Sequence, residues 1–264
     1  MSASAHSSAA VCSSPSFSKA VAAAALRLRQ TLAVHGAASV AGLASPHATN
    51  EDLFQLRRLL EALGAGAAGM AVVRGESDAL LIRAEKAANA NGARALGFGD
   101  AGAVVEGLRN GSLKGLIALG HDVLDAAYLG DSSALAGLEA LVVIDSHRSE
   151  LERAAHVVLP ARVPAEKYGT LVNCDGRVQR VVPAVEPAFE ALDEGEWLAR
   201  LGAALQLPGF ASGASYDARA VSRELANSVA GFSGCDWDGV GDAGRPQGGA
   251  DVAARAPAAE GARA

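Results

Sequence analysis

The chain has 264 residues, 50% of them hydrophobic, which is long enough for one large α/β domain or two tightly joined lobes. A net charge of -6 with scattered Lys and Arg excludes a nucleic-acid groove, and the lack of an uncharged apolar stretch of about 18 residues excludes membrane insertion. The widely spaced Cys12, Cys174 and Cys235 exclude a zinc or iron–sulfur site within one segment and favour a reducing compartment.

Both ends have the composition of disordered tails. Residues 1–17 are rich in Ser and Ala, and residues 233–264 are rich in Gly, Ala, Pro and Asp without periodic apolar positions. The first of these segments also lacks the basic start and continuous apolar run of a signal peptide. We therefore expect one structured domain over residues 18–232.

The first structured stretch predicts a helix, a strand and a second helix. Residues 19–34 favour a helix, and the short apolar run 37–44 between Gly and Pro indicates a buried strand. Thr49 is suited to cap the next helix, because its hydroxyl can accept from free backbone N–H groups. That helix has one apolar face, made of Leu53, Leu56, Leu60 and Leu63. Residues 64–94 are Gly-rich and mixed, and we assign no element there.

From residue 101 the chain alternates helices and strands. The pattern predicts helices at 101–108, near 134 and at 149–155, and strands at 115–119, 140–145 and 156–160. This alternation implies a parallel sheet with helices on both faces. Such sheets bind ligands at the carboxyl ends of their strands, so we expect the site around residues 120–122 and 145–147.

Beyond Pro160 the chain is punctuated by Gly and Pro. A strand over 170–173, an Asp-Gly turn at 175–176 and a strand over 178–182 predict a hairpin. Apolar residues at helical spacing then predict helices over 194–205 and 215–229.

Several motifs resemble those of the molybdopterin oxidoreductase family. The order and separation of these motifs agree with the family over residues 18–206. They are L-P at 159–160, E-K-Y-G-T at 166–170, N-C-D-G-R-V-Q at 173–179, the helix start at 45–51, G-H-D at 120–122, and Asp145 with Ser149 and Glu150. Within the family, residues 90–97 and the short connections look most similar to the large peripheral subunit of bacterial NADH-quinone oxidoreductase.

The resemblance implies a doubly wound α/β core of the formate dehydrogenase/DMSO reductase type and a cleft for molybdopterin guanine dinucleotide. Carboxylates suit the N–H edge of guanine, backbone N–H groups and Arg suit phosphates, and side-chain amides suit the pterin. The cofactor-binding residues expected on this basis are Gly120, Asp122, Asp145, Glu166, Gly169, Thr170, Asn173, Gly176, Arg177 and Gln179.

Several of these residues also have a purely structural interpretation. Asp145 can cap a helix or form a turn, Arg177 can pair with Glu166, and Asn173 with Gly176 can shape a turn. We expect Trp197 in the core and Cys174 as a passive thiol. The remaining histidines of interest, His121, His147 and His156, lack metal-ligand spacing and are expected on the surface or in loops.

Departures from the family pattern weaken the case for chemistry. Leu151 replaces a hydroxyl residue, His156 replaces an acid, and Tyr168 fills a position that is small or acidic in the family. The chain also lacks the family's N-terminal cysteine cluster, a cysteine to ligate molybdenum and the C-terminal domain that completes the second pterin site. We therefore expect no metal ligand, no catalytic residue and no cofactor bound by this chain alone.

Three functional hypotheses follow. The leading one is a structural segment of the large peripheral subunit of an NADH:quinone oxidoreductase, cytoplasmic and held near the inner membrane through other peripheral-arm subunits. The alternative is the part of a molybdenum oxidoreductase that binds molybdopterin guanine dinucleotide. A free-standing nucleotide-binding or regulatory module is the third. Bound molybdenum cofactor separates the first two, and no hydrolase or kinase motif is present.

Overall fold

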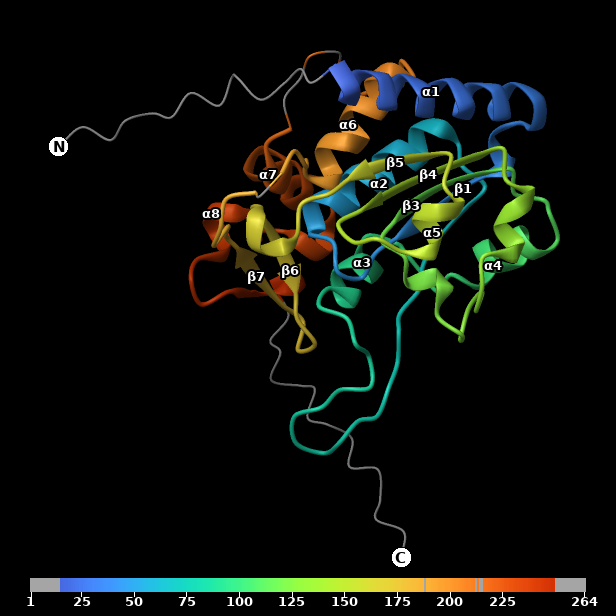
Figure 1. Ribbon diagram of the computed structural model, residues 1–264. Helices are drawn as coiled ribbons and strands as arrows, with labels where there is room; N and C mark the ends of the chain where they lie inside the picture. The colour runs from blue at the N-terminus through green and yellow to red at the C-terminus, as the bar shows by residue number, and fades with distance from the viewer. Residues whose placement is uncertain (1–14, 188, 212, 214–215, 250–264) are drawn as a thin grey trace, which may run out of the picture.

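The computed structural model describes residues 15–187, 189–211, 213 and 216–249. The outer parts of the two expected tails, 1–14 and 250–264, lie outside the described residues. The described chain forms a parallel sheet between two layers of helices, with a smaller antiparallel sheet beside it (Figure 1).

The main sheet has five parallel strands in the order β2-β1-β3-β4-β5. Their bounds are Val40–Ala44 for β1, Ala67–Met70 for β2, Gly115–Leu119 for β3, Ala140–Asp145 for β4 and Val157–Pro160 for β5. After β1 the chain adds β2 on one side and then returns to add β3 on the other. This reversal is a topological switch point, where the loops after two neighbouring strands part and leave a crevice.

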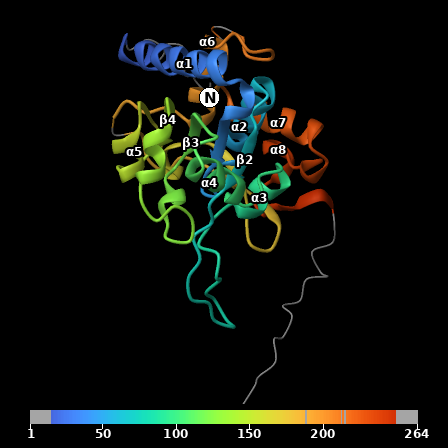
Figure 2. The same ribbon diagram turned by 90° about the vertical axis from the view of Figure 1, so that its right-hand side faces the viewer.

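Helices cover both faces of this sheet, which confirms the predicted doubly wound α/β fold. On one face lie α1 (Pro15–His35), α2 (Asn50–Leu63) and α6 (Glu194–Ala204), and on the other lie α4 (Gly102–Arg109) and α5 (Glu150–Ala154) (Figures 1 and 2). Strand side chains alternate between the two cores: Ile117 and Val142 join the first, Leu116 and Leu141 the second. Both faces being buried explains why β3 and β4 are apolar at nearly every position.

The smaller sheet contains the predicted hairpin. It has the order β6-β7-β8, with β6 at Gly169–Val172, β7 at Arg177–Val181 and β8 at Arg245–Pro246. Gly176 has φ +76° in the turn between the first two strands, a conformation that glycine adopts without strain. Helices α3 (Ala90–Ala95), α7 (Ala218–Ser228) and α8 (Trp237–Val240) pack around the hairpin.

The prediction of disorder from residue 233 is wrong for residues 233–249, which contain α8 and β8. Trp237 and Cys235 are buried, and Asp236 caps α8 by accepting from the backbone N–H of Gly239. Helix α1 likewise begins at Pro15, inside the expected first tail. In this segment single buried side chains are separated by turns, so its sequence has no periodic apolar pattern. Composition alone therefore gave the wrong prediction of disorder.

Residues 64–94 hold two elements that the sequence did not reveal, β2 and α3. Strand β2 reads A-A-G-M, too small and short for a strand signal, and its place is set by pairing with β1. The helix expected near Ala134 is a 3-10 turn over Ser133–Gly137. Residues 37–39 of the expected first strand also form a 3-10 turn.

Between β2 and α3 the chain projects from the body as a long loop (Figures 1 and 2). We call residues 73–86 the finger. Its stem is held by the backbone bonds from Lys86 N to Val73 O and from Gly75 N to Ala84 O, at 2.9 and 3.0 Å.

Candidate functional site

A pocket of about 440 Å³ opens at the carboxyl ends of β1, β3 and β4, where the strand order reverses. We call it the switch-point pocket. The residues around it come from the loops after these strands and after β5, and from the start of α6: Ser45, His47, Ala48, Gly120, His121, Asp122, Ile144, Asp145, Ser146, His147, Arg162, Pro164, Lys167 and Glu194.

Gly120 allows the loops after β1 and β3 to approach closely. It has φ +67°, and a Cβ at this position would lie 3.1 Å from the Oγ of Ser45. That hydroxyl accepts from the backbone N–H of His47 at 3.2 Å and fixes the β1 loop. The G-H-D sequence therefore forms a tight turn that brings His121 and Asp122 to the pocket wall.

Asp145 is held by two neighbours at the end of β4. Its Oδ2 lies 2.6 Å from Nδ1 of His121, and its Oδ1 accepts from the backbone N–H of His147 at 3.0 Å. Since an ionised carboxylate only accepts, Nδ1 of His121 carries the hydrogen. The Asp145 side chain is only 6% exposed, whereas that of His121 is 45% exposed. The histidine thus covers the acid at the pocket mouth.

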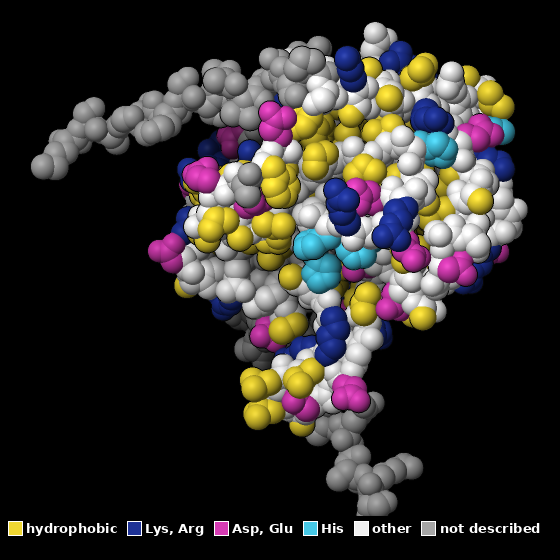
Figure 3. Space-filling view, viewed as in Figure 1, with side chains coloured by type: hydrophobic (Ala, Val, Ile, Leu, Met, Phe, Trp, Pro, Cys, Tyr) yellow, Lys and Arg dark blue, Asp and Glu magenta, His cyan; other side chains and the backbone are white. Residues whose placement is uncertain are grey.

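Asp122 is the second carboxylate of the pocket. Burial raises its pKa above the ordinary value, against the opposing effects of His47 and His121. The Nε2 of His47 lies 3.9 Å from Oδ1 of Asp122. Figure 3 shows histidine side chains gathered near the middle of the face seen there. These two aspartates therefore lie beside a histidine rim that becomes cationic on protonation.

A buried charge cluster forms the floor of the pocket. The Lys167 ammonium, 1% exposed, donates to Oδ2 of Asp52 at 2.9 Å and to Oε2 of Glu194. Burial raises the pKa of Glu194 to about 7 despite Lys167, and the two carboxylates keep the pKa of Lys167 above its ordinary value. Tyr216 donates its hydroxyl hydrogen to Oδ1 of Asp52 at 3.0 Å. One cation is thus shared by two buried acids.

The start of α2 ties this floor to the hairpin. Thr170 donates from its backbone N–H to Oε2 of Glu51 at 2.7 Å, and its hydroxyl donates to Oε1 at 2.8 Å. Asn50 donates to the Thr170 hydroxyl at 3.0 Å and accepts from Asn89 at 2.9 Å. Burial raises the pKa of Glu51 to about 7, which the two bonds from Thr170 only partly oppose. These polar groups are satisfied within the protein.

The expected cofactor-binding residues fall into two groups in the structure. Gly120, Asp122 and Asp145 meet in the switch-point pocket. The others belong to the small sheet and the turn before it, outside the pocket lining: Glu166, Gly169, Thr170, Asn173, Gly176, Arg177 and Gln179. Gly169 lies so close to α2 that a Cβ there would meet Cγ2 of Thr49 at 2.4 Å.

The hairpin residues make internal bonds. Asn173 Oδ1 accepts from the backbone N–H groups of Asp175 and Arg177, and its Nδ2 donates to Gln179 at 3.2 Å. Arg177 donates to the carbonyl oxygens of residues 243 and 244. Glu166 accepts from the backbone N–H of Val163. The ion pair between Arg177 and Glu166, one of the structural interpretations given above, is therefore not formed. Asn173 does shape the turn, as its structural interpretation predicted.

Among the ionisable residues of the pocket lining, four were not expected as site residues from the sequence: His47, Arg162, Lys167 and Glu194. The first two follow β1 and β5, so the rule that located residues 120–122 could have found them. Arg162 donates to Ala191 O and reaches Asp193, whose pKa burial raises to about 6. The other two carry no local signal, because their contacts join distant segments.

The remaining sequence interpretations can be placed as well. Trp197 is fully buried and donates to Pro160 O at 2.8 Å, as expected for a core residue. Leu151 is the buried residue of α5 and lies in the core on that face of the sheet. His156 accepts from the backbone N–H of Leu141, and burial lowers its pKa. Cys174 is exposed in the hairpin turn.

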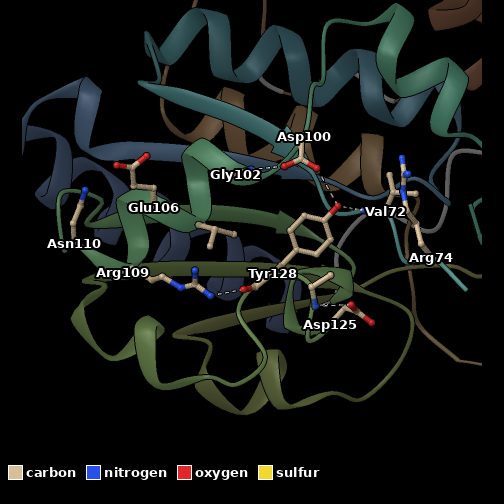
Figure 4. A pocket seen from close by; sticks show the side chains of 11 residues that line it. Val72, Arg74, Asp100, Gly102, Glu106, Arg109, Asn110, Asp125 and Tyr128 are labelled. Carbon is tan, nitrogen blue, oxygen red and sulfur yellow. Dashed lines mark hydrogen bonds between the residues drawn. The ribbon is translucent and has the colours of Figure 1, made fainter.

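A larger cavity of about 670 Å³ lies beside α4 (Figure 4). Tyr128 stands in it, with its hydroxyl accepting from Val72 N at 2.9 Å and donating to Asp100 at 3.2 Å. Arg109 donates to the backbone oxygen of Tyr128. This cavity contains none of the expected site residues. Its polar groups hydrogen-bond to one another and to the surrounding loops, so the switch-point pocket is the better candidate.

Within residues 15–187, 189–211, 213 and 216–249, no group of three or more His, Cys, Asp or Glu side chains is arranged to hold a metal ion. Over the same ranges, no helix has the length and apolar character needed to cross a bilayer.

The switch-point pocket suits the nucleotide end of a dinucleotide cofactor. Its volume lies within the range of about 300 to 1,000 Å³ typical of ligand sites. Asp122 provides a carboxylate for guanine N–H groups, whereas both oxygens of Asp145 are already engaged by His121 and His147. The amides expected to bind the pterin, Asn173 and Gln179, are bonded to each other in the hairpin. The residues present thus offer Asp122 to a guanine base, and the amides expected to bind the pterin are engaged within the hairpin.

Comparison with known proteins finds a match to the Molybdopterin oxidoreductase family over residues 67–203, just over half of the chain. The NADPH-Fe(3+) oxidoreductase subunit alpha of Geobacter sulfurreducens is 40% identical over 100 residues, 37% of this chain and 12% of that protein. The G-type subunit of the NADH-quinone oxidoreductase of Escherichia coli is 28% identical over 153 residues, 55% of this chain and 17% of that protein.

A third similar protein is the F420-dependent formate dehydrogenase subunit alpha of Methanocaldococcus jannaschii, 48% identical over 61 residues, 23% of this chain and 9% of that protein. The chain thus spans less than a fifth of the length of each of these three relatives.

Proposed function

Since the chain belongs to the molybdopterin oxidoreductase family, we propose that it is a structural α/β segment in the large peripheral subunit of an NADH:quinone oxidoreductase complex. The similarity to the Escherichia coli NADH-quinone oxidoreductase protein, over 55% of this chain, supports this placement. In this role the segment binds other peripheral-arm subunits, lies on the cytoplasmic side and reaches the membrane only through them. It contributes to assembly and performs no redox step by itself.

One observation carries the structural role. The motif that resembles the cofactor cleft is engaged within the chain: Thr170 binds Glu51, and Asn173 binds Gln179. Groups already paired in the folded protein are not free to hold a ligand without losing those bonds. The motif therefore serves to join the hairpin to α2.

Co-purification tests this proposal. The full chain, tagged and expressed in its native host, is isolated with its bound proteins, which are identified and quantified by mass spectrometry. We expect peripheral-arm subunits of the quinone oxidoreductase in a fixed ratio to the chain. Recovery of the chain without them would contradict the placement.

A second candidate function is favoured by the switch-point pocket: binding of molybdopterin guanine dinucleotide as part of a molybdenum oxidoreductase. Asp122 would hold the guanine, Asp145 would position His121, and the loop at Gly120 with protonated His47 or His121 would face the phosphates. When bound, this cofactor supplies a molybdenum or tungsten centre for electron transfer. The pterin end would have to be held by another polypeptide.

Two measurements test this second function. Elemental analysis for molybdenum and tungsten, together with fluorescence of the oxidised pterin, would detect cofactor in stoichiometric amount. Titration of the purified chain with GMP would detect the guanine subsite alone, and Asp122→Ala should abolish that binding while Asp238→Ala, an exposed position on α8, leaves it intact. Lack of cofactor together with lack of GMP binding would exclude this function.

A further inference from the structure

The tip of the finger exposes three consecutive large apolar side chains. Leu80, Leu81 and Ile82 are 84%, 81% and 51% exposed. Figure 3 shows a group of hydrophobic side chains at the end of the projecting loop, away from the body of the molecule. Contiguous exposed apolar side chains are characteristic of interaction sites, because leaving them in water is unfavourable.

The tip is held in one conformation by Asp78. Its Oδ1 accepts from the backbone N–H groups of Leu80, Leu81 and Ile82, at 2.8, 2.7 and 2.8 Å. These bonds also hold the pKa of Asp78 below its ordinary value. The apolar side chains are therefore displayed by a turn built around one carboxylate.

Hydrogen bonds and ion pairs of charged side chains also hold the stem of the finger. Lys86 donates its ammonium hydrogens to the backbone oxygens of Glu76 and Arg83, both at 2.6 Å. Glu85 accepts from Arg74 on the facing side of the stem and from Arg94 on α3, at 2.8 and 2.5 Å. The finger thus projects as a preorganised element, which reduces the ordering cost of binding.

Charge argues for a protein as the partner of this tip. The charged side chains of the finger cancel, with Arg74, Arg83 and Lys86 against Glu76, Asp78 and Glu85. The whole chain carries a formal charge of -6, which opposes approach to an anionic membrane. An apolar pocket in a protein requires no net charge and accommodates Leu and Ile side chains.

We propose that the finger is a docking element whose tip, residues 80–82, inserts into an apolar pocket on another polypeptide of the same electron-transfer assembly. This inference rests on the proposed structural role in a quinone oxidoreductase. The relatives named above extend far beyond the part that matches this chain. In those proteins most of the polypeptide lies outside the matching part, and the finger here projects away from the body of the molecule (Figure 1).

Site-specific photocrosslinking in the native host tests the docking. A benzoylphenylalanine at position 81 of the full chain is expected to give an adduct with a peripheral-arm subunit, identified by mass spectrometry. The matched control carries the same group at Leu26, which is 55% exposed on α1, and should give no such adduct. The alternative partners are tested with purified protein. Crosslinking between copies of the chain tests self-association, and neutral or anionic phospholipid vesicles test membrane binding.

Two variants test the energetics. Leu80→Asp with Leu81→Asp should lower retention of those subunits by about 30-fold or more, the loss expected for removing an interface anchor. Asp78→Ala keeps the apolar tip but removes the acceptor of three N–H groups, so a smaller loss is expected. Unchanged thermal unfolding of both variants would show that the body remains folded, because the tip is solvent-exposed.

The outcomes separate this inference from the function on which it rests. Subunits that co-purify equally with the wild type and the Asp variant would overturn the docking element and leave the structural role standing. Failure of the wild type to recover any subunit would overturn both. Adducts between two copies of the chain, or vesicle binding that depends on residues 80 and 81, would overturn the proposed partner.

Discussion

Glu51 is a fully buried carboxyl at the start of α2, with a pKa of about 7 against 4.5 for the free side chain. Burial favours its neutral form, and Thr170 binds both of its oxygens. In the unfolded chain the same group loses its proton near pH 4.5. Between these two values the folded protein holds more protons, so its free energy of unfolding falls as the pH rises.

Glu51→Gln should reduce this pH dependence. The shift of Glu51 corresponds to a loss of at most about 3 kcal/mol of stability in the wild type between pH 4.5 and about pH 7. The neutral amide removes this loss, although the raised pKa of Glu194 leaves a further loss in the same direction in both proteins. Urea unfolding at a series of pH values measures both proteins. Glu106→Gln, exposed on α4, should behave like the wild type, and equal slopes for all three would contradict the prediction.

Lys167→Met should destabilise the protein by about 3 to 5 kcal/mol near neutral pH, because Asp52 and Glu194 then lose their shared cation. The loss should shrink as the pH falls below about 7, because Glu194 then takes up a proton and no longer needs the cation. Urea unfolding gives both values, with Lys19→Met on the surface of α1 as the control. Adding Glu194→Gln to the Lys167 variant should restore part of the stability. No recovery would assign the loss to packing instead of charge.

At the scale of elements, the start of helix α2 depends on Thr49, the residue just before its first turn. The Thr49 hydroxyl accepts from the backbone N–H of Asp52 at 3.3 Å and donates to its Oδ2 at 2.6 Å. The same helix start holds the acids that bind the hairpin and α6. The cap thus orients a polar junction as well as starting the helix.

Thr49→Ala should lower the free energy of unfolding by about 1 to 2 kcal/mol, the usual effect of removing a capping hydroxyl. Thermal and urea unfolding measure it. Thr49→Ser keeps the hydroxyl and should recover most of the loss. If Ser is as destabilising as Ala, the methyl group packed beside Gly169 matters more than the cap.

The elements that the sequence predicted well are those with a strong local signal. Strands β3 and β4 are continuous apolar runs, and their bounds match the prediction. Strand β2 has only Ala, Gly and Met, so pairing with β1 defines it. In the site, Asp122 and Asp145 followed from their positions after strands. Lys167 and Asp52 did not, because a buried ion pair across 115 residues has no local pattern.

For the whole molecule, residues 233–249 act as a structural part of the fold. Trp237 is 4% exposed, and its backbone N–H donates to the Ser222 hydroxyl on α7 at 3.0 Å. Arg245 pairs with Val178 of the hairpin. The segment therefore joins α7 to the small sheet after the last predicted helix has ended.

A chain that ends at residue 232 should be markedly less stable than one that ends at residue 249. Loss of the Trp237 side chain alone is expected to remove about 3 to 5 kcal/mol. Thermal unfolding of the two truncated chains beside the full chain measures the difference. Equal midpoints for the two truncations would show that this segment adds nothing to stability.

The polar junction at the start of α2 also has a consequence for the order of folding. Its bonds to Thr170, Gly195 and Tyr216 join residues 119 to 164 positions apart. On the ribosome, Asp52 emerges long before the residues that enclose it, so its carboxylate stays hydrated until synthesis has passed residue 216. Contacts of such sequence separation slow folding, and the nascent chain remains open at this point until its second half has arrived.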